Sequence, residues 1–266
     1  MPGGQDAQNE KGISMRKSIF LSSRTRSTLS SLTAIAMVSA AAPALAQEEE
    51  GSEFTVSGNA AIVSEYRFRG VGFSDGDIAI QGGVDVSHES GFYIGTWGSS
   101  LEEGTTVPNF GHTELDIYGG WSGDIASGLS ADVGLLYYAF PNSTNGFSTD
   151  YLEAYGSLST TLGPVEATVG LAYAFDNSAL AGDNVYVYGG LSAGIPETPI
   201  TLNANLGYTD GSLDVSGSGN YLDWNLGADF AITENLTISA QYIDTDAPSV
   251  NNVTDSTFVF TLAVSF

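Results

Sequence analysis

The chain ends on Ser256-Thr257-Phe258-Val259-Phe260-Thr261-Leu262-Ala263-Val264-Ser265-Phe266. Successive side chains of a β-strand take opposite faces, so this segment has one large apolar face and one face of small polar residues. Phe258, Phe260, Leu262, Val264 and Phe266 share the first face, and Thr257, Thr261 and Ser265 share the second. Two classes of protein end on such a strand, the outer-membrane β-barrel and the soluble β-sandwich, so the rest of the chain has to decide between them.

The N-terminal region has the composition of a secretory signal. A basic start between Arg16 and Arg26 precedes an apolar stretch that ends at Ala42, and Ala44-Leu45-Ala46 supplies a small-residue cleavage site. We therefore predict export with cleavage near Ala46. The predicted division of the chain is an upstream extension (1–14), a signal peptide (15–46), a short acidic N-terminal segment (47–53) and an outer-membrane β-barrel (54–266).

Removing this signal changes the charge balance. The sequence has seven Lys and Arg residues against 31 Asp and Glu residues. Only Arg67 and Arg69 of the basic residues lie beyond Gln47, whereas only Asp6 and Glu10 of the acidic residues lie before it. So acidic a chain repels nucleic acid, which excludes nucleic-acid binding. The sequence has no cysteine, and this fits an exported barrel that needs no disulfide.

Apolar residues after position 53 follow the period of two that is typical of β-strands. No later window holds the roughly 18 to 20 continuous apolar residues of a membrane helix, so a membrane protein of this sequence has to be a barrel. Most alternating segments have about the 9 to 12 residues with which a tilted strand crosses a bilayer. The twelve predicted strands are Phe54–Phe68, Ile78–Ser87, Phe92–Ser100, Gly111–Trp121, Leu129–Phe140, Asp150–Thr160, Val165–Phe175, Asn184–Ile195, Ile200–Tyr208, Tyr221–Ala231, Leu236–Ile243 and Ser256–Phe266.

The connections between these segments sort by parity. Those after even-numbered strands are short, such as His88 to Gly91, and most of those after odd-numbered strands are longer and polar. Short turns at one end and long loops at the other are typical of outer-membrane barrels. The predicted fold class is therefore all-β, a transmembrane antiparallel up-and-down β-barrel of about 12 strands in the bacterial outer membrane. The last strand then has to pair with the first, because closure leaves no free edge.

Outward-facing aromatic residues gather near the predicted strand ends, where a barrel carries its interfacial girdle. The orientation of the segment 92–100 stays open, because Tyr93 and Trp97 compete with Phe92 and Ile94 for the outward face. The predicted girdle consists of Tyr66, Phe68, Trp121, Tyr137, Tyr173, Phe175, Tyr208, Trp224, Tyr242 and Phe258.

One region near the start of the predicted barrel carries a family resemblance. It reads Val63-Ser64-Glu65-Tyr66-Arg67-Phe68-Arg69-Gly70-Val71, then Asp75-Gly76-Asp77, Ala79-Ile80-Gln81-Gly82-Gly83-Val84-Asp85, Ser87-His88, Ser90-Gly91-Phe92-Tyr93 and Gly95-Thr96-Trp97-Gly98-Ser99-Ser100. This stretch resembles the TorF family of proteobacterial porins, catalogued as secreted proteins of unknown function. Gly72-Phe73-Ser74 departs from the polar turn of that family. The resemblance implies an outer-membrane barrel with a transport role, and it brings no substrate and no catalytic residue.

Arg67 and Arg69 alternate with Tyr66 and Phe68 in the first predicted strand. On the lipid face at mid-depth each arginine would cost roughly 2 to 4 kcal/mol, so we expect both in the lumen. Two interpretations stay open: the arginines brace neighbouring strands, or they form one wall of a charged constriction that orients solutes. The other residues predicted to line this constriction are Glu65, Asp85, Glu114, Asp116, Asp132, Glu153, Tyr155, Tyr186 and Tyr188.

Twelve strands give a lumen between that of filled eight-stranded barrels and that of sixteen-stranded porins, and inward-facing tyrosines would narrow it. The main hypothesis is a porin for passive diffusion of small solutes, which prefers cations because its narrow lumen is acidic. The alternative is a closed structural or recognition barrel. Its acidic loops, with pairs such as Asp75 and Asp77, would bind partners or divalent cations.

Enzymatic activity is not predicted. Beyond Gln47 the only histidines are His88 and His112, and a Ser–His hydrolase needs a serine and an orienting group beside one of them. No spacing of metal ligands appears, so no cofactor and no metal are predicted. The predicted partners are outer-membrane lipid, small solutes and the barrel-assembly machinery, which would recognise the C-terminal strand ending in Phe266.

Overall fold

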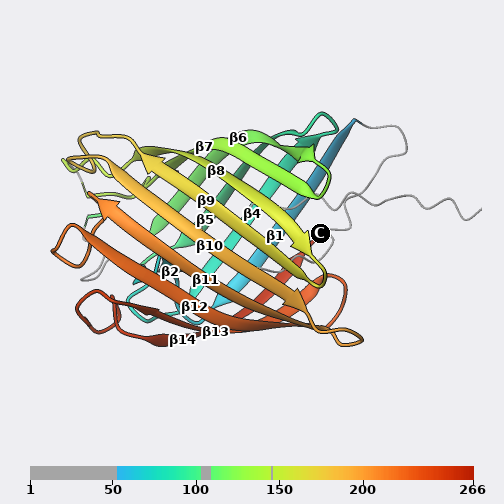
Figure 1. The fold of residues 1–266 in the computed structure, drawn as a ribbon. Helices are drawn as coiled ribbons and strands as arrows, with labels where there is room; N and C mark the ends of the chain where they lie inside the picture. The colour runs from blue at the N-terminus through green and yellow to red at the C-terminus, as the bar shows by residue number, and fades with distance from the viewer. Residues whose placement is uncertain (1–52, 103–108, 145) are drawn as a thin grey trace, which may run out of the picture.

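The computed structural model describes residues 53–102, 109–144 and 146–266, and they form a closed β-barrel (Figure 1). Neighbouring strands are antiparallel all the way round, so the predicted fold class is confirmed. In these ranges no helix is long and apolar enough to cross a membrane. The twelve barrel strands are β1 (Phe54–Val63), β4 (Ala79–His88), β5 (Phe92–Ser100), β6 (Thr113–Ala126), β7 (Leu129–Ala139), β8 (Tyr151–Leu162), β9 (Val165–Ala174), β10 (Asn184–Gly194), β11 (Ile200–Gly211), β12 (Asn220–Ala231), β13 (Leu236–Thr245) and β14 (Thr257–Ser265).

The barrel closes where the first and last strands meet. β1 and β14 pair from Asn59 opposite Ser265 to Val63 opposite Thr261. Two further backbone hydrogen bonds join Gly58 and Phe266, at 2.8 and 2.9 Å. The phenylalanine ring lies over Gly58, where a Cβ atom would come within 2.7 Å of it. The predicted closure is therefore confirmed, and the glycine leaves room for the terminal ring.

The two faces of the wall differ as the alternation predicts. On β14, Phe258 and Phe260 are exposed, whereas Val259 and Thr261 are buried towards the lumen. The same pattern on other strands gives an apolar outer surface, which is the surface that lipid covers in a membrane barrel. It also settles the orientation of β5: Phe92 and Ile94 point outwards, and Tyr93 and Trp97 point inwards.

The described connections alternate between short and long, as predicted. Short turns join β4 to β5, β6 to β7, β8 to β9, β10 to β11 and β12 to β13, and we call this the short-turn end. Longer connections leave the opposite end, which we call the long-loop end. The predicted upstream extension, signal peptide and most of the acidic segment (residues 1–52) lie outside the described residues.

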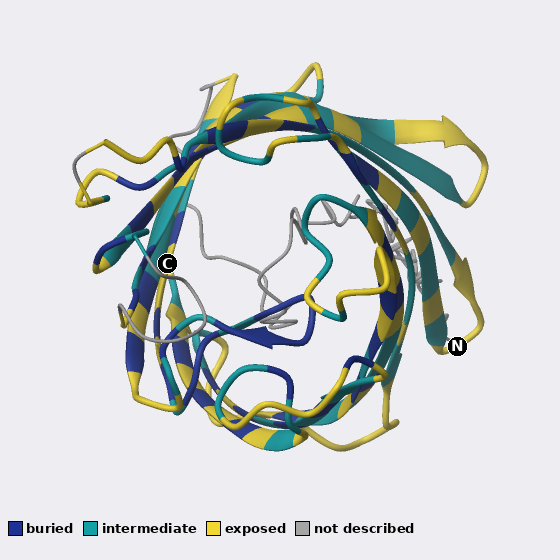
Figure 2. Ribbon diagram, turned by 90° about the vertical axis from the view of Figure 1, so that its left-hand side faces the viewer, coloured by how far each residue is buried: buried dark blue, intermediate teal, exposed yellow. Residues whose placement is uncertain are grey.

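The first strand is shorter than predicted. β1 ends at Val63. The next residue, Ser64, donates its N–H to the carbonyl of Phe260 at 2.8 Å, but its side-chain hydroxyl, and not its carbonyl, accepts the hydrogen bond from the Phe260 N–H at 2.9 Å. Residues 64–78, which we call the inner loop, then turn into the barrel, and Figure 2 shows a buried strand lying inside the ring of strands. The predicted outward placement of Tyr66 and Phe68 is wrong, because these side chains are only 3% and 4% exposed.

Candidate functional site: the inner loop in the lumen

The inner loop contains a small hairpin, β2 (Arg67–Phe68) and β3 (Val71–Gly72). Arg67 pairs with Gly72 and Phe68 with Val71, so Arg69 and Gly70 are the two residues of the turn. Their φ angles are 50° and 81°, and two positive values are typical of the type I′ turn that suits the twist of a hairpin. Glycine adopts such angles freely, but for arginine they cost about 1 to 2 kcal/mol. The contacts of the Arg69 side chain offset this strain.

Arg69 carries a positive charge into the interior of the barrel. Its Nη2 atom lies 2.8 Å from both carboxylate oxygens of Glu153 on β8. Its guanidinium carbon lies 4.2 Å from the ring centre of Tyr186 on β10, a cation–π contact. The Arg69 and Glu153 side chains are 2% and 0% exposed. Because β8 and β10 lie far from β1 in the order of strands, the loop reaches well across the lumen.

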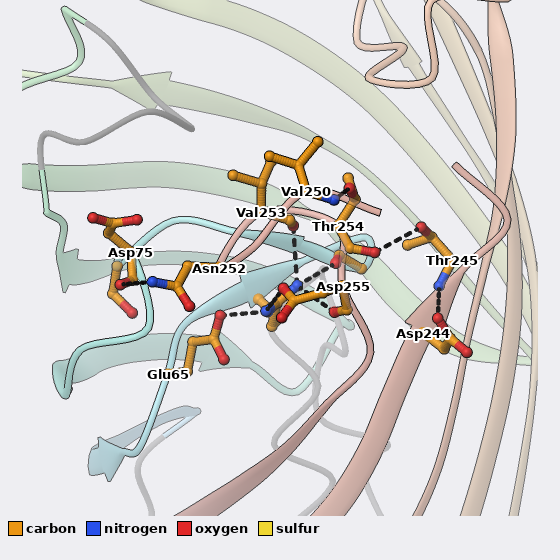
Figure 3. A network of polar contacts seen from close by, with 12 residues as sticks. Glu65, Asp75, Asp244, Thr245, Val250, Asn252, Val253, Thr254 and Asp255 are labelled. Carbon is orange, nitrogen blue, oxygen red and sulfur yellow. Dashed lines mark hydrogen bonds and ion pairs between the residues drawn. The ribbon is translucent and has the colours of Figure 1, made fainter. Parts of the chain in front are cut away.

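Arg67 has a different role from Arg69. Its Nε atom lies 2.6 Å from Glu65, and its Nη2 atom lies 3.2 Å from the carboxylate of Asp255. Its Nη1 atom donates to the backbone carbonyls of Gly70, Val253 and Asp255. Figure 3 shows this network, in which the connection between β13 and β14 surrounds the base of the inner loop. The geometry of Arg67 is that of a brace, while Arg69 forms the charged tip.

Replacing Arg67 with Lys is expected to loosen the inner loop while preserving the charge. A lysine has a single ammonium group and cannot bond Glu65, Asp255 and three carbonyls in the planar arrangement that a guanidinium allows. Added protease should therefore cut residues 64–78 of the folded variant faster than in the unmodified protein. Asp244→Asn, which alters a neighbouring carboxylate that Arg67 does not contact, is the control. An Arg67→Lys variant that is cut no faster than the unmodified protein would contradict the bracing role.

Apolar contacts hold the inner loop against one side of the lumen. The ring of Tyr66 lies 5.5 Å from Phe73 and 5.8 Å from Trp97 on β5. The ring of Phe68 lies 5.9 Å from Tyr138 on β7. These rings belong to a buried apolar cluster, and burial of each large side chain contributes roughly 1.5 to 3 kcal/mol. The loop is therefore packed as part of the core and fills the lumen beside β5 to β8.

The predicted constriction residues fall into separate groups. Glu153 and Tyr186 contact Arg69, and Glu65 contacts Arg67. Buried Glu114 accepts a hydrogen bond from the hydroxyl of Tyr66, at 3.3 Å, and buried Asp116 lies two residues further along β6.

The remaining predicted residues do not contact the arginines. Asp85 pairs with Tyr118 at 2.7 Å, and Asp132 pairs with Tyr93 at 2.6 Å. Tyr155 shares a hydrogen bond with Tyr93. Tyr188 stacks on Tyr186, with ring centres 5.6 Å apart. The residues predicted to form one constriction therefore lie in two layers. One layer surrounds the inner loop, and the other, which we call the lower layer, lies nearer the short-turn end and contains Asp85, Asp132, Tyr93, Tyr118 and Tyr155.

A cavity of about 50 Å³ remains on the other side of the inner loop. Arg69 Nε and Nη1 and Asp223 Oδ2 are buried there with no hydrogen-bond partner among the described residues, so the cavity offers both donors and an acceptor. Gln81, Asn225 and Gln241 were not among the predicted site residues, although their positions on the inward face of their strands could have identified them. The cavity lining is Val63, Glu65, Tyr66, Arg67, Arg69, Gly70, Gln81, Asp223, Asn225, Gln241, Ile243, Val259 and Thr261.

One acidic loop at the long-loop end uses its carboxylate internally. Asp214 accepts hydrogen bonds from Ser216, Gly217 and Gly219, at 2.5 to 2.9 Å. Although desolvation opposes the change, these bonds hold the pKa of the Asp214 carboxyl below its ordinary value. Over the parts of the chain that the structure describes, no group of three or more His, Asp or Glu residues is arranged to hold a metal ion.

These features define a twelve-stranded barrel of the outer-membrane type, with a charged loop folded into its lumen. The chain belongs to the family described as bacterial protein of unknown function (Gcw_chp), whose model matches residues 47–266. No curated protein matches the sequence. The finer resemblance to the TorF family stays a prediction.

Solved porin structures share the fold. The KdgM porin superposes with a TM-score of 0.54 at 8% identity, over 79% of this chain and 98% of that one. The NanC porin superposes with a TM-score of 0.53 at 11% identity, also over 79% and 98% of the two chains. At such low identity the likeness establishes the fold alone, and what the barrel carries has to be argued from its own residues.

Proposed function

We propose that this protein is an outer-membrane channel for passive diffusion of small solutes, and that the inner loop sets the width and charge of its passage. The observation that carries the proposal is the ion pair between Arg69 and Glu153, which holds the loop across the lumen and leaves the polar cavity beside it. Solutes pass between the loop and the wall formed by β12, β13, β14, β1 and β4. No turnover and no cofactor are involved.

The charges of this passage favour cations. Arg69 is neutralised by Glu153, and Arg67 by Glu65 and Asp255. Asp223 faces the cavity, and it has no arginine in bonding contact among the described residues. An unpaired carboxylate in a narrow polar passage attracts cations and repels anions. Asp85 and Asp132 in the lower layer add to this field.

Ion selectivity is measured with purified protein in a planar bilayer under a KCl gradient. Stepwise currents are expected, with a reversal potential whose sign reports potassium preference. Asp223→Asn should shift the reversal potential towards zero, and Asp214→Asn in an outer loop should leave it unchanged. A chloride preference would contradict the acidic passage.

A closed barrel is the second candidate, and the buried apolar cluster around Tyr66 and Phe68 favours it. In that case the inner loop seals the lumen and the long-loop end presents a recognition surface. The bilayer experiment separates the two candidates, because a sealed barrel passes no stepwise current. Both candidate functions place the barrel in the outer membrane, with lipid around its apolar outer surface. In both, the strand ending in Phe266 directs assembly.

A further inference from the structure

The lumen tyrosines lie flat against the barrel wall on glycines of neighbouring strands. A Cβ atom on Gly95 would collide with the ring of Tyr118, and Gly120, Gly134 and Gly170 would collide in the same way with Tyr93, Tyr155 and Tyr188. Because glycine has no side chain, each ring can cover the backbone of the next strand, as in the aromatic rescue of sheet glycines. Tyr155 and Tyr188 therefore narrow the lumen less than their inward placement predicted.

Hydrogen bonds fix these rings in place. The Tyr93 hydroxyl bonds Asp132 and the Tyr155 hydroxyl, both at 2.6 Å. The Tyr118 hydroxyl donates to Asp85 at 2.7 Å. The rings of Tyr118, Tyr155 and Tyr188 are partly exposed to the interior. Together with Tyr93 they form a rigid aromatic surface on β5, β6, β8 and β10, which we call the tyrosine platform.

Amide and carboxylate side chains lie on the opposite arc of the barrel. Asn203 on β11 donates to Asp229 on β12 at 2.8 Å, and Asn205 donates to Asn225 at 3.1 Å. In the order of strands, β11 and β12 lie across the barrel from β5 and β6, which carry Tyr93 and Tyr118, whereas β10 with Tyr188 is the neighbour of β11. Asn203 Oδ1 and Asp229 Oδ1 are buried with no partner among the described residues, so each can accept a further hydrogen bond.

Parts of the two surfaces lie at a common depth. Tyr93, Asp132, Asn203 and Asp229 all lie within four residues of the short-turn ends of their strands. Tyr118 and Tyr155 start further from this end, but their hydroxyls reach the same layer through hydrogen bonds with Asp85 and Tyr93. Both arginines of the barrel region, by contrast, lie in the inner loop. The lower layer thus has aromatic faces on one side, hydrogen-bonding groups on the other, and several carboxylates.

We propose that this lower layer binds uncharged sugar rings on their way through the channel, an inference that rests on the proposed function. The apolar face of a sugar ring stacks on flat aromatic faces, while its hydroxyls bond paired amide and carboxylate groups. Acidic sugars are disfavoured, because Asp85, Asp132 and Asp229 would repel them without a nearby arginine. The tyrosine platform selects for a ring, and the opposite arc selects for hydroxyls.

Vesicle swelling tests this inference with D-glucose and with mannitol, a linear polyol of similar mass. Glucose should enter vesicles that contain the protein faster than mannitol by roughly two- to tenfold, the range of one aromatic stacking contact. Tyr155→Leu and, separately, Tyr188→Leu should remove this preference. Tyr155→Phe should keep it, because it keeps the ring. Tyr173→Leu, which alters an outward-facing tyrosine of β9, is the matched control.

Failure of the inference can be distinguished from failure of the proposed function. If the channels conduct KCl but glucose and mannitol enter at equal rates, or neither enters, the sugar site is refuted and the channel stands. If no KCl current appears, the channel itself is refuted. Preference for glucose that survives both leucine variants would also overturn the tyrosine platform, and the vesicle-inserted fraction of each variant shows that it has folded.

Discussion

Replacing residues 64–78 with Asn-Gly is expected to raise the single-channel conductance at least about threefold, because the cross-section that the inner loop fills becomes open to water. Val63 and Ala79 are paired directly, so a two-residue type I′ turn can join β1 to β4 without changing their register. Planar-bilayer recording measures the effect. The variant loses Arg67 and Arg69 together with Glu65, Asp75 and Asp77, so the conductance, and not the ion selectivity, is the readout.

A matched control for this variant changes a turn at the opposite end. Replacing Gly163-Pro164, between β8 and β9, with Asn-Gly alters a two-residue connection and leaves the lumen intact. Its conductance should equal that of the unmodified protein. If shortening the inner loop leaves the conductance unchanged while the control behaves normally, the loop does not limit the passage.

Arg69→Asn is expected to lower the free energy of unfolding by about 3 to 5 kcal/mol, the usual cost of leaving one member of a buried ion pair without its partner. Asparagine tolerates the positive φ of the turn, so the substitution isolates the loss of charge from backbone strain. Glu153 would then be a buried carboxylate with the Tyr138 hydroxyl 3.4 Å from its Oε1 atom. Urea titration of the protein folded into lipid vesicles measures the change.

The double variant Arg69→Asn with Glu153→Gln completes this test. Removing both charges should restore most of the lost stability, because no buried carboxylate is left unpaired. Glu153→Gln alone should be destabilising, since it leaves the guanidinium buried without an anion. A single Arg69→Asn variant as stable as the unmodified protein would show that the ion pair does not hold the loop.

The strands of the barrel could be predicted because they depend on patterns between residues close together in the sequence. Alternation in segments such as Val165–Phe175 fixes which side chains face lipid, and turn residues fix where each strand ends. The structure confirms ten of the predicted strands to within three residues at each boundary, including β9 (Val165–Ala174), and β6 runs five residues past its predicted end at Trp121. The closure through Phe266 followed from the need to leave no strand edge.

The inner loop could not be predicted in the same way. Tyr66 to Arg69 alternate apolar and charged residues just as a membrane strand does, and parity alone cannot distinguish an outward face from a loop folded into the lumen. Contacts between residues distant in sequence, from Arg69 to Glu153 and from Arg67 to Asp255, hold this segment inside the lumen. The Arg69-Gly70 pair was a usable signal, because glycine in the second position suits a type I′ turn.

The arrangement of the lumen residues in two layers could not be predicted from the sequence either. The alternation of side chains places both Glu153 and Asp132 on the inner face, but it gives neither their depth in the barrel nor their partners. Depth depends on the tilt and register of each strand, and these are set by pairing around the whole barrel. The flat packing of Tyr155 on Gly134 depends on that register as well.

A disulfide between Gly70→Cys and Asp223→Cys tests the central claim, that the inner loop lies across the lumen, most directly. A Cβ atom on Gly70 would lie 3.0 Å from the Cβ of Asp223, so a small shift brings the pair to the roughly 3.5 to 4.5 Å of a disulfide. The chain has no cysteine of its own, so any cross-link is this one. Gly70→Cys with Leu222→Cys, which faces outwards, is the control. We expect rapid oxidation to the disulfide in the folded barrel only for the first pair; two free thiols in that pair, in a barrel that has folded, would contradict the account.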